Sequence, residues 1–208
     1  MARKTSKNHI EPRKTPAQAR SAETVAAILE AAARILEDKG FRGYNTNDVA
    51  ARAGVSIGSL YQYFPNKDAI TKALLRRETE PLSAAFEQVG DAPSLVEGLQ
   101  RFVRAAVAHQ LRRPVLARLL DFEEARLPLQ AENGALGEVG AKALGRLLSR
   151  HGAGRGAAAR TASHDMFAIV KGMIDAAGER GETDAQALEA RVTAAMSGYL
   201  QQMKIIDL

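Results

Sequence analysis

The chain has 208 residues, of which 46% are hydrophobic, enough for the buried core of one large domain or of a small and a larger one. It contains no cysteine, which excludes disulfides and thiolate metal sites, and no apolar run long enough to span a membrane. The net charge of +5 is unevenly distributed along the chain. Residues 1–80 hold 14 Lys or Arg against 9 Asp or Glu, and residues 81–208 hold 15 of each. This imbalance favours an anionic partner, either nucleic acid or a membrane surface.

Alanine is abundant, proline is scarce and strand-like alternation is absent, so the sequence predicts an all-α fold. Residues 1–20 form a basic arm in which Glu11 is the single acidic residue. Without apolar periodicity, the arm is expected to be disordered when free. It is either a solvated tail or a source of extra phosphate contacts, and both interpretations stay open. Since its polar, basic start also lacks the apolar core of a signal peptide, we expect a soluble, cytoplasmic protein.

Residues 21–39 are predicted to form an amphipathic helix, capped by Ser21 and ended by Gly40. The next segment, TNDVAARAGVSIGSLYQYFPNK from Thr46 to Lys67, divides into two short helices. We expect Thr46 to cap the first helix and Gly54 to end it with a positive φ. A glycine-containing turn of a few residues between two short helices indicates a helix-turn-helix.

The second short helix begins after Ser56, its expected N-cap, and cannot continue past Pro65. Leu60 and Phe64 lie four residues apart and are expected to be buried together. The opposite face carries small or hydrogen-bonding residues, including a glycine that costs about 1 kcal/mol relative to alanine inside a helix. Close approach of another surface would explain that glycine, and a DNA major groove with its phosphates suits such a helix end.

At these residues the chain closely resembles the DNA-binding signature of the TetR family of transcriptional regulators. The resemblance covers roughly residues 20–80 and includes the turn glycine, the serine cap, the Leu60-Tyr61-x-Tyr63-Phe64 run and Lys67. It implies that the phosphate contacts come from Thr46, Tyr61, Tyr63 and Lys67. The residues expected to face bases are Ser56, Ile57, Gly58, Ser59 and Gln62, of which Gln62 can bond adenine and Ile57 can contact a thymine methyl.

We therefore predict three parts: a basic arm at 1–20, a DNA-binding domain at 21–66, and a helical regulatory and dimerisation domain at 67–208. A long helix over 67–89, kinked by Pro81, is expected to belong to both domains. Further helices are predicted at about 93–111, 114–128, 131–150, 157–180 and 184–204. Movement of the second domain would then pass directly to the DNA-binding helices.

The second domain is expected to enclose a pocket for a small apolar or amphipathic effector, as in TetR-like regulators. From the apolar stripes and this analogy, the candidate lining residues are Phe86, Phe102, His109, Phe122 and Phe167. The last two helices carry apolar stripes that favour a homodimer through a four-helix bundle. The residues predicted for that interface are Met166, Val170, Met173, Leu188, Val192, Met196 and Tyr199.

The leading interpretation is a bacterial homodimeric repressor that binds a pseudo-palindromic DNA operator and is released by the effector. The alternative is a DNA-binding adaptor controlled by a protein partner, without a small-molecule pocket. An enzyme is disfavoured, because no nucleophile stands with a base and an orienting partner, and we predict no cofactor and no metal. The operator, the effector and the regulated genes do not follow from the sequence.

Overall fold

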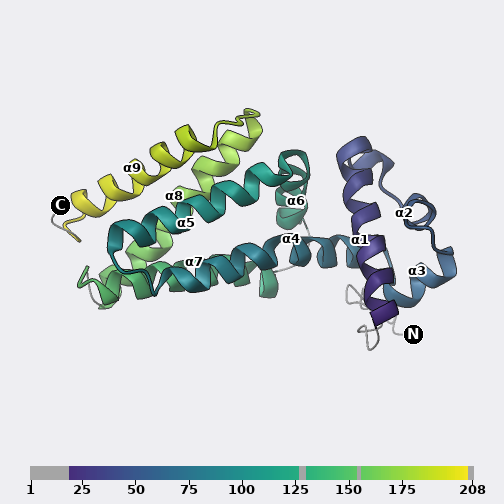
Figure 1. Ribbon diagram of the computed structural model, residues 1–208, viewed down its shortest axis with the longest axis horizontal. Helices are drawn as coiled ribbons and strands as arrows, with labels where there is room; N and C mark the ends of the chain where they lie inside the picture. The colour runs from purple at the N-terminus through teal and green to yellow at the C-terminus, as the bar shows by residue number, and fades with distance from the viewer. Residues whose placement is uncertain (1–18, 127–129, 154–155, 206–208) are drawn as a thin grey trace, which may run out of the picture. The chain divides into compact units, whose positions relative to one another are not determined.

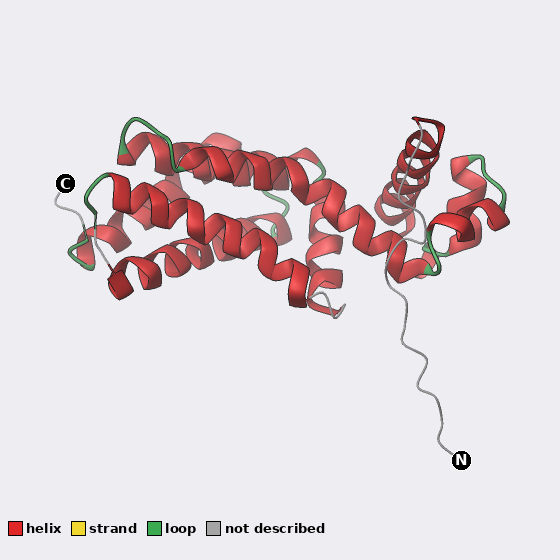
Figure 2. Cartoon of the chain, turned by 90° about the horizontal axis from the view of Figure 1, so that it is seen from below, coloured by secondary structure: helices red, strands yellow, loops and turns green. Residues whose placement is uncertain are grey.

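The computed structural model describes residues 19–126, 130–153 and 156–205, and every regular element in these ranges is helical (Figures 1 and 2). The predicted all-α class is therefore confirmed. The predicted arm, residues 1–20, lies outside the described residues except for its last two positions. Within the described ranges, none of the helices has the length and apolar character that a membrane crossing requires.

The chain divides into two units, and α4 (Lys67–Val89) and α6 (Pro114–Arg126) each contribute to both. Unit 1 comprises the described residues up to Arg77 and those of α6 from Leu119 onward, and unit 2 comprises the rest. The division within α4 lies in the segment predicted to be shared. The assignment of the second half of α6 to unit 1 differs from the predicted arrangement, which placed all of 67–208 in the second domain.

Unit 1 contains α1 (Ala19–Lys39), the 3-10 turn η1 (Phe41–Gly43), α2 (Thr46–Ala53), α3 (Ile57–Tyr63) and the first half of α4. Helix α1 packs against α2 and η1, and α2 packs against α3. Their apolar faces are fully buried, for example at Ile28, Val49 and Leu60. Helix α1 begins at Ala19, so Ser21 lies inside it and is not its cap.

Unit 2 is built from the second half of α4 with α5 (Leu95–Arg112), α7 (Gln130–Arg150), α8 (Gly156–Glu179) and α9 (Ala185–Gln202). Helix α8 packs against α5, α7 and α9, and α5 also packs against α9 (Figure 1). Helix α4 continues through Pro81 to Val89, so the proline does not end it. Ser94 and Asp184 cap α5 and α9 through bonds from the amides of Glu97 and Ala187.

Candidate nucleic-acid interface

Local hydrogen bonds set the geometry of the helix-turn-helix. The side chain of Asn45 caps α2 by accepting from Asp48 N at 2.9 Å, so the cap lies one residue before the predicted Thr46. Gly54 has φ 69° and ψ 29°, the left-handed conformation predicted for it. Val55 N then donates to Ala50 O at 3.0 Å, which closes the turn as a helix C-terminal motif.

Helix α3 has one buried face and one open face. Leu60 and Phe64 are buried, as predicted, and fix the helix against the rest of unit 1. Ile57 is 39% exposed and lies on the open face with Gly58 and Gln62, which are also exposed. A Cβ placed at Gly58 would meet only Ser56 Oγ, at 3.8 Å. The glycine is therefore not required by contacts within unit 1.

Two pairs of hydroxyl groups involve residues of α3. Ser56 Oγ accepts from Ser59 N at 3.0 Å, the expected N-cap bond, and lies 2.8 Å from Ser59 Oγ. The Ser59 hydroxyl is thus partly engaged within the helix cap. Thr46 Oγ1 lies 3.1 Å from the phenolic oxygen of Tyr61, which joins the start of α2 to the middle of α3. Thr46 and Tyr61 were predicted separately as phosphate ligands, and the structure brings their hydroxyl groups together.

Lys67 begins α4 beside the buried ring of Tyr44. Its ammonium lies 5.6 Å from the ring centroid, within the range of a cation–π contact. Thr71 Oγ1 donates to Tyr44 Oη at 3.2 Å and also lies 3.1 Å from the carbonyl oxygen of Lys67. Burial raises the pKa of Tyr44 well above its ordinary value. Tyr63, the remaining predicted phosphate ligand, is half-buried.

The residues predicted to line an effector pocket fall into two groups. Phe86 and Phe102 are buried in unit 2 with parallel rings 4.0 Å apart, and the half-buried Phe167 meets both edge-on. Half-buried His109 lies on α5, and burial, followed by the charge of Arg112, lowers its pKa. Phe122 is separate, because it lies on the part of α6 that belongs to unit 1 and is 67% exposed.

Gln110, which was not predicted, is a buried polar residue on α5. It is 4% exposed, and its Nε2 has no hydrogen-bond partner among the described residues. It packs on Gly178 of α8, where a Cβ would lie 2.4 Å from Nε2 if nothing shifted. The sequence does contain a signal for this burial, because Gln110 follows Ala106 by four residues and so continues the apolar stripe of α5. An unsatisfied buried amide costs about 1–3 kcal/mol.

The residues predicted for a dimer interface face mainly into their own chain. Five of the seven belong to the core of unit 2, namely Met166, Val170, Leu188, Val192 and Met196. These five side chains are not available to a partner, because the large apolar stripes of α8 and α9 are buried by packing within the chain. Met173 and Tyr199 are half-buried, and Tyr199 Oη donates to Asp165 Oδ2 at 2.6 Å.

The outer faces of α8 and α9 carry small residues among charged and polar ones such as Lys171 and Arg191. The small residues are exposed on both helices: Ala168 and Gly172 on α8, and Ala190, Ala194 and Gly198 on α9. Both glycines lie inside their helices, and a Cβ placed on either would meet nothing within 4 Å. A glycine inside a helix costs about 1 kcal/mol relative to alanine, and no contact within the chain requires either of these two.

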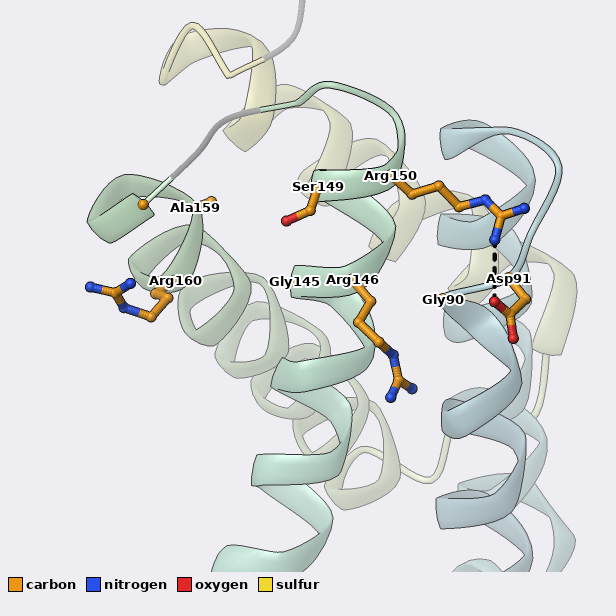
Figure 3. A pocket seen from close by; sticks show the side chains of 9 residues that line it. Gly90, Asp91, Gly145, Arg146, Ser149, Arg150, Ala159 and Arg160 are labelled. Carbon is orange, nitrogen blue, oxygen red and sulfur yellow. Dashed lines mark hydrogen bonds and ion pairs between the residues drawn. The ribbon is translucent and has the colours of Figure 1, made fainter.

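An open groove of about 570 Å³ lies in unit 2 near the ends of α4, α7 and α8 (Figure 3). Arg146 of α7 donates to the carbonyl oxygen of Glu87 at 3.0 Å, and Arg150 pairs with Asp91 at 3.2 Å. Gly90 makes room for Arg146, since a Cβ there would lie 2.9 Å from Nε. These arginines join α7 to the end of α4, so we interpret the groove as part of the packing. Within the described residues, no group of three or more His, Asp or Glu could hold a metal ion.

Comparison with known proteins gives two family matches on this chain. Residues 28–74 match the model of bacterial regulatory proteins of the tetR family, and residues 94–200 match that of tetracyclin repressor-like C-terminal domains. The A-factor receptor protein of Streptomyces griseus is 36% identical over 97 residues, 46% of this chain and 34% of that protein. The regulator EthR of Mycobacterium tuberculosis is 34% identical over 68 residues, 33% of this chain and 32% of that protein. The alignments thus span about a third of these relatives' length.

Solved structures share the fold at lower identity. A TetR-family regulator from Mesorhizobium loti superposes with a TM-score of 0.71 at 18% identity, covering 89% of this chain and 98% of that one. SmeT, the repressor of a multidrug efflux pump in Stenotrophomonas maltophilia, superposes with a TM-score of 0.68 at 20% identity, covering 85% and 91%.

Proposed function

Because the chain belongs to the tetR family of bacterial regulatory proteins, we propose that it is a homodimeric repressor that binds operator DNA and is released by a small molecule. The family is one of DNA-binding regulators rather than enzymes, in agreement with the expectation from sequence. The observation that carries the proposal is the open face of α3, where Gly58 has no packing role and Gln62 and Ile57 are exposed. Acting on DNA places the protein in the cytoplasm.

Helix α3 enters the major groove with its open face toward the bases. Gln62 contacts an adenine edge, and Ile57 contacts a thymine methyl group. The Thr46–Tyr61 hydroxyl pair and Lys67 bind phosphates on either side of the groove and fix the position of the helix. Because the Ser59 hydroxyl lies 2.8 Å from Ser56 Oγ, Ser59 contributes less to base recognition than Gln62.

The homodimer pairs the small-residue faces of α8 and α9 with those of a second copy. Exposed Gly172 and Gly198 are the residues on which two helices approach most closely, since an added Cβ at either meets nothing in its own chain. Half-buried Met173 and Tyr199 border this face. Two-fold pairing places two copies of α3 on one side of the duplex, about one helical turn or a little more apart.

The effector is an apolar or amphipathic molecule that binds in unit 2 at the aromatic cluster of Phe86, Phe102 and Phe167. Phe167 is the half-buried member, and it fills the space beside Gly140, where a Cβ would lie 2.6 Å from its ring. Phe86 lies on α4, the helix that also carries Lys67, so displacement of the cluster changes the position of the phosphate contact. A coupling of about 1–3 kcal/mol is typical of such a link.

Selection of bound sequences from a random DNA pool tests the DNA-binding proposal. We expect a motif with two-fold symmetry, and sedimentation at micromolar concentration should give a dimer. A motif without symmetry, or a monomer, would contradict the proposal. The effector role is tested by titrating a ligand found by thermal-shift screening with and without operator. Equal ligand affinity in both titrations would remove the sensor role for that ligand.

A further inference from the structure

The first turn of α4 and the corner between η1 and α2 meet at a single buried aromatic ring. Tyr44 is 3% exposed and follows η1 directly, and Phe41 of η1 lies edge-on to it at 6.3 Å. Lys67 and Thr71 lie four residues apart on α4 and therefore project from the same side of the helix toward this ring. The phenolic oxygen meets Thr71 Oγ1 at 3.2 Å, and the Lys67 ammonium lies over the ring face.

A lysine side chain ordinarily samples many rotamers, and ordering it on a phosphate costs up to about 2 kcal/mol of conformational entropy. At Lys67 the structure already restricts the side chain, because the ammonium is held 5.6 Å from the Tyr44 centroid and the residue is half-buried. Tyr44 is itself fixed by burial and by the Thr71 hydroxyl, so its ring is a rigid support. A lysine positioned in this way loses less entropy when it binds a phosphate.

We propose that Tyr44 is a positioning residue for DNA binding, which holds the Lys67 ammonium over its ring and so prearranges the phosphate contact at the start of α4. This inference rests on the proposed phosphate role of Lys67. Tyr44 is buried below the surface, so it acts through Lys67 and does not touch DNA. The ring is the active part, and the hydroxyl serves to orient it.

A double-mutant cycle on the full-length protein tests this inference, with fluorescence anisotropy on the selected operator and on a random duplex over a series of salt concentrations. Lys67→Ala should weaken binding to both duplexes and reduce the salt dependence of the affinity, the salt slope, by about one. Tyr44→Leu removes the ring and should weaken binding to both duplexes by about two- to fivefold. This is the loss expected when an exposed to partly buried cation–π contact is removed. In the Lys67→Ala background, Tyr44→Leu should have no further effect. Tyr44→Phe keeps the ring and should stay within about twofold of the wild type.

Ile28→Val is the matched control, because it destabilises the core of unit 1 at a buried residue of α1, whereas Lys67 begins α4. It should lower thermal stability and leave DNA affinity and salt slope unchanged, so a merely structural effect of Tyr44 would resemble this control. Additive effects of Tyr44→Leu and Lys67→Ala would overturn the positioning role and leave the phosphate role of Lys67 intact. If Lys67→Ala alone changed neither affinity nor slope, the phosphate contact itself would be excluded.

Discussion

Replacement of Gly58 by alanine should stabilise the protein and weaken its binding to DNA. The added methyl group would meet only Ser56 Oγ, at 3.8 Å, an ordinary van der Waals contact. The backbone at Gly58 is not among the positive-φ glycines, so alanine is compatible with it. Such a substitution raises the free energy of unfolding by about 0.4–1 kcal/mol, chiefly through the unfolded state.

The same methyl group projects from the face that we place against the bases. If the helix and the duplex are in close contact there, the added volume should cost about 1–3 kcal/mol of binding, as overpacking does in protein cores. Since each 1.4 kcal/mol corresponds to tenfold, affinity should fall by about five- to 150-fold. Urea unfolding measures the first effect, and fluorescence anisotropy on the selected operator at fixed salt measures the second.

Gly145→Ala provides a matched control in α7, where a Cβ would meet Ser163 no closer than 3.7 Å. It should give a similar gain in stability with unchanged DNA affinity. A Gly58→Ala variant that is more stable and binds operator as tightly as the wild type would refute close approach of DNA at this position. A less stable variant would instead refute our description of the free space around Gly58.

Further substitutions test other parts of the molecule. Gln62→Ala should relax the preference at one base pair by about 1–3 kcal/mol without changing the salt slope, as measured by repeating the selection. An unchanged motif would exclude Gln62 from base recognition. Gly172→Ala should weaken self-association in sedimentation while the helix content is retained, and an unaltered dimer would place the interface elsewhere. Gln110→Met removes the unpartnered Nε2 and should raise the free energy of unfolding in urea by about 1 kcal/mol. A loss of stability would mean that this amide has a partner in solution. Because burial lowers the pKa of His109, the unfolded chain binds its proton more readily, so wild-type stability should fall as pH drops below about 6.5. Urea midpoints at pH 7.5 and 5.5 should show this loss in the wild type and less of it in His109→Gln.

The helix-turn-helix was predictable in detail because its signals are local. Gly54 in the left-handed conformation, Ser56 as the cap of α3 and the placement of Leu60 and Phe64 on one face of the chain depend on neighbours within a few residues. The cap of α2 was misplaced by one residue, because Asn45 and Thr46 are adjacent and both can act as caps. The helices of unit 2 were predicted within a few residues for the same reason, through their capping residues and apolar spacing.

The contacts that define the candidate site required the tertiary structure. Thr46 and Tyr61 are 15 residues apart in sequence and meet at 3.1 Å only because α2 and α3 pack around the Gly54 turn. Tyr44 and Lys67 are brought together by the return of α4 to the η1 corner, and no local pattern relates them. Likewise, periodicity placed a glutamine in the stripe of α5 without indicating that its amide would face Gly178.

The sequence by itself determined the helical class, the order of the helices and the helix-turn-helix, because capping, glycine conformation and 3.6-residue periodicity act over one or two turns. Only the tertiary structure decided which face of each helix packs within the chain and which face stays exposed. On α8 and α9 the apolar stripes that predicted a dimer are buried in the core of their own chain, and the small residues opposite them remain exposed. A stripe of large apolar residues requires burial but does not specify whether its partner is the same chain or another, and that choice depends on how neighbouring helices fill the space around it.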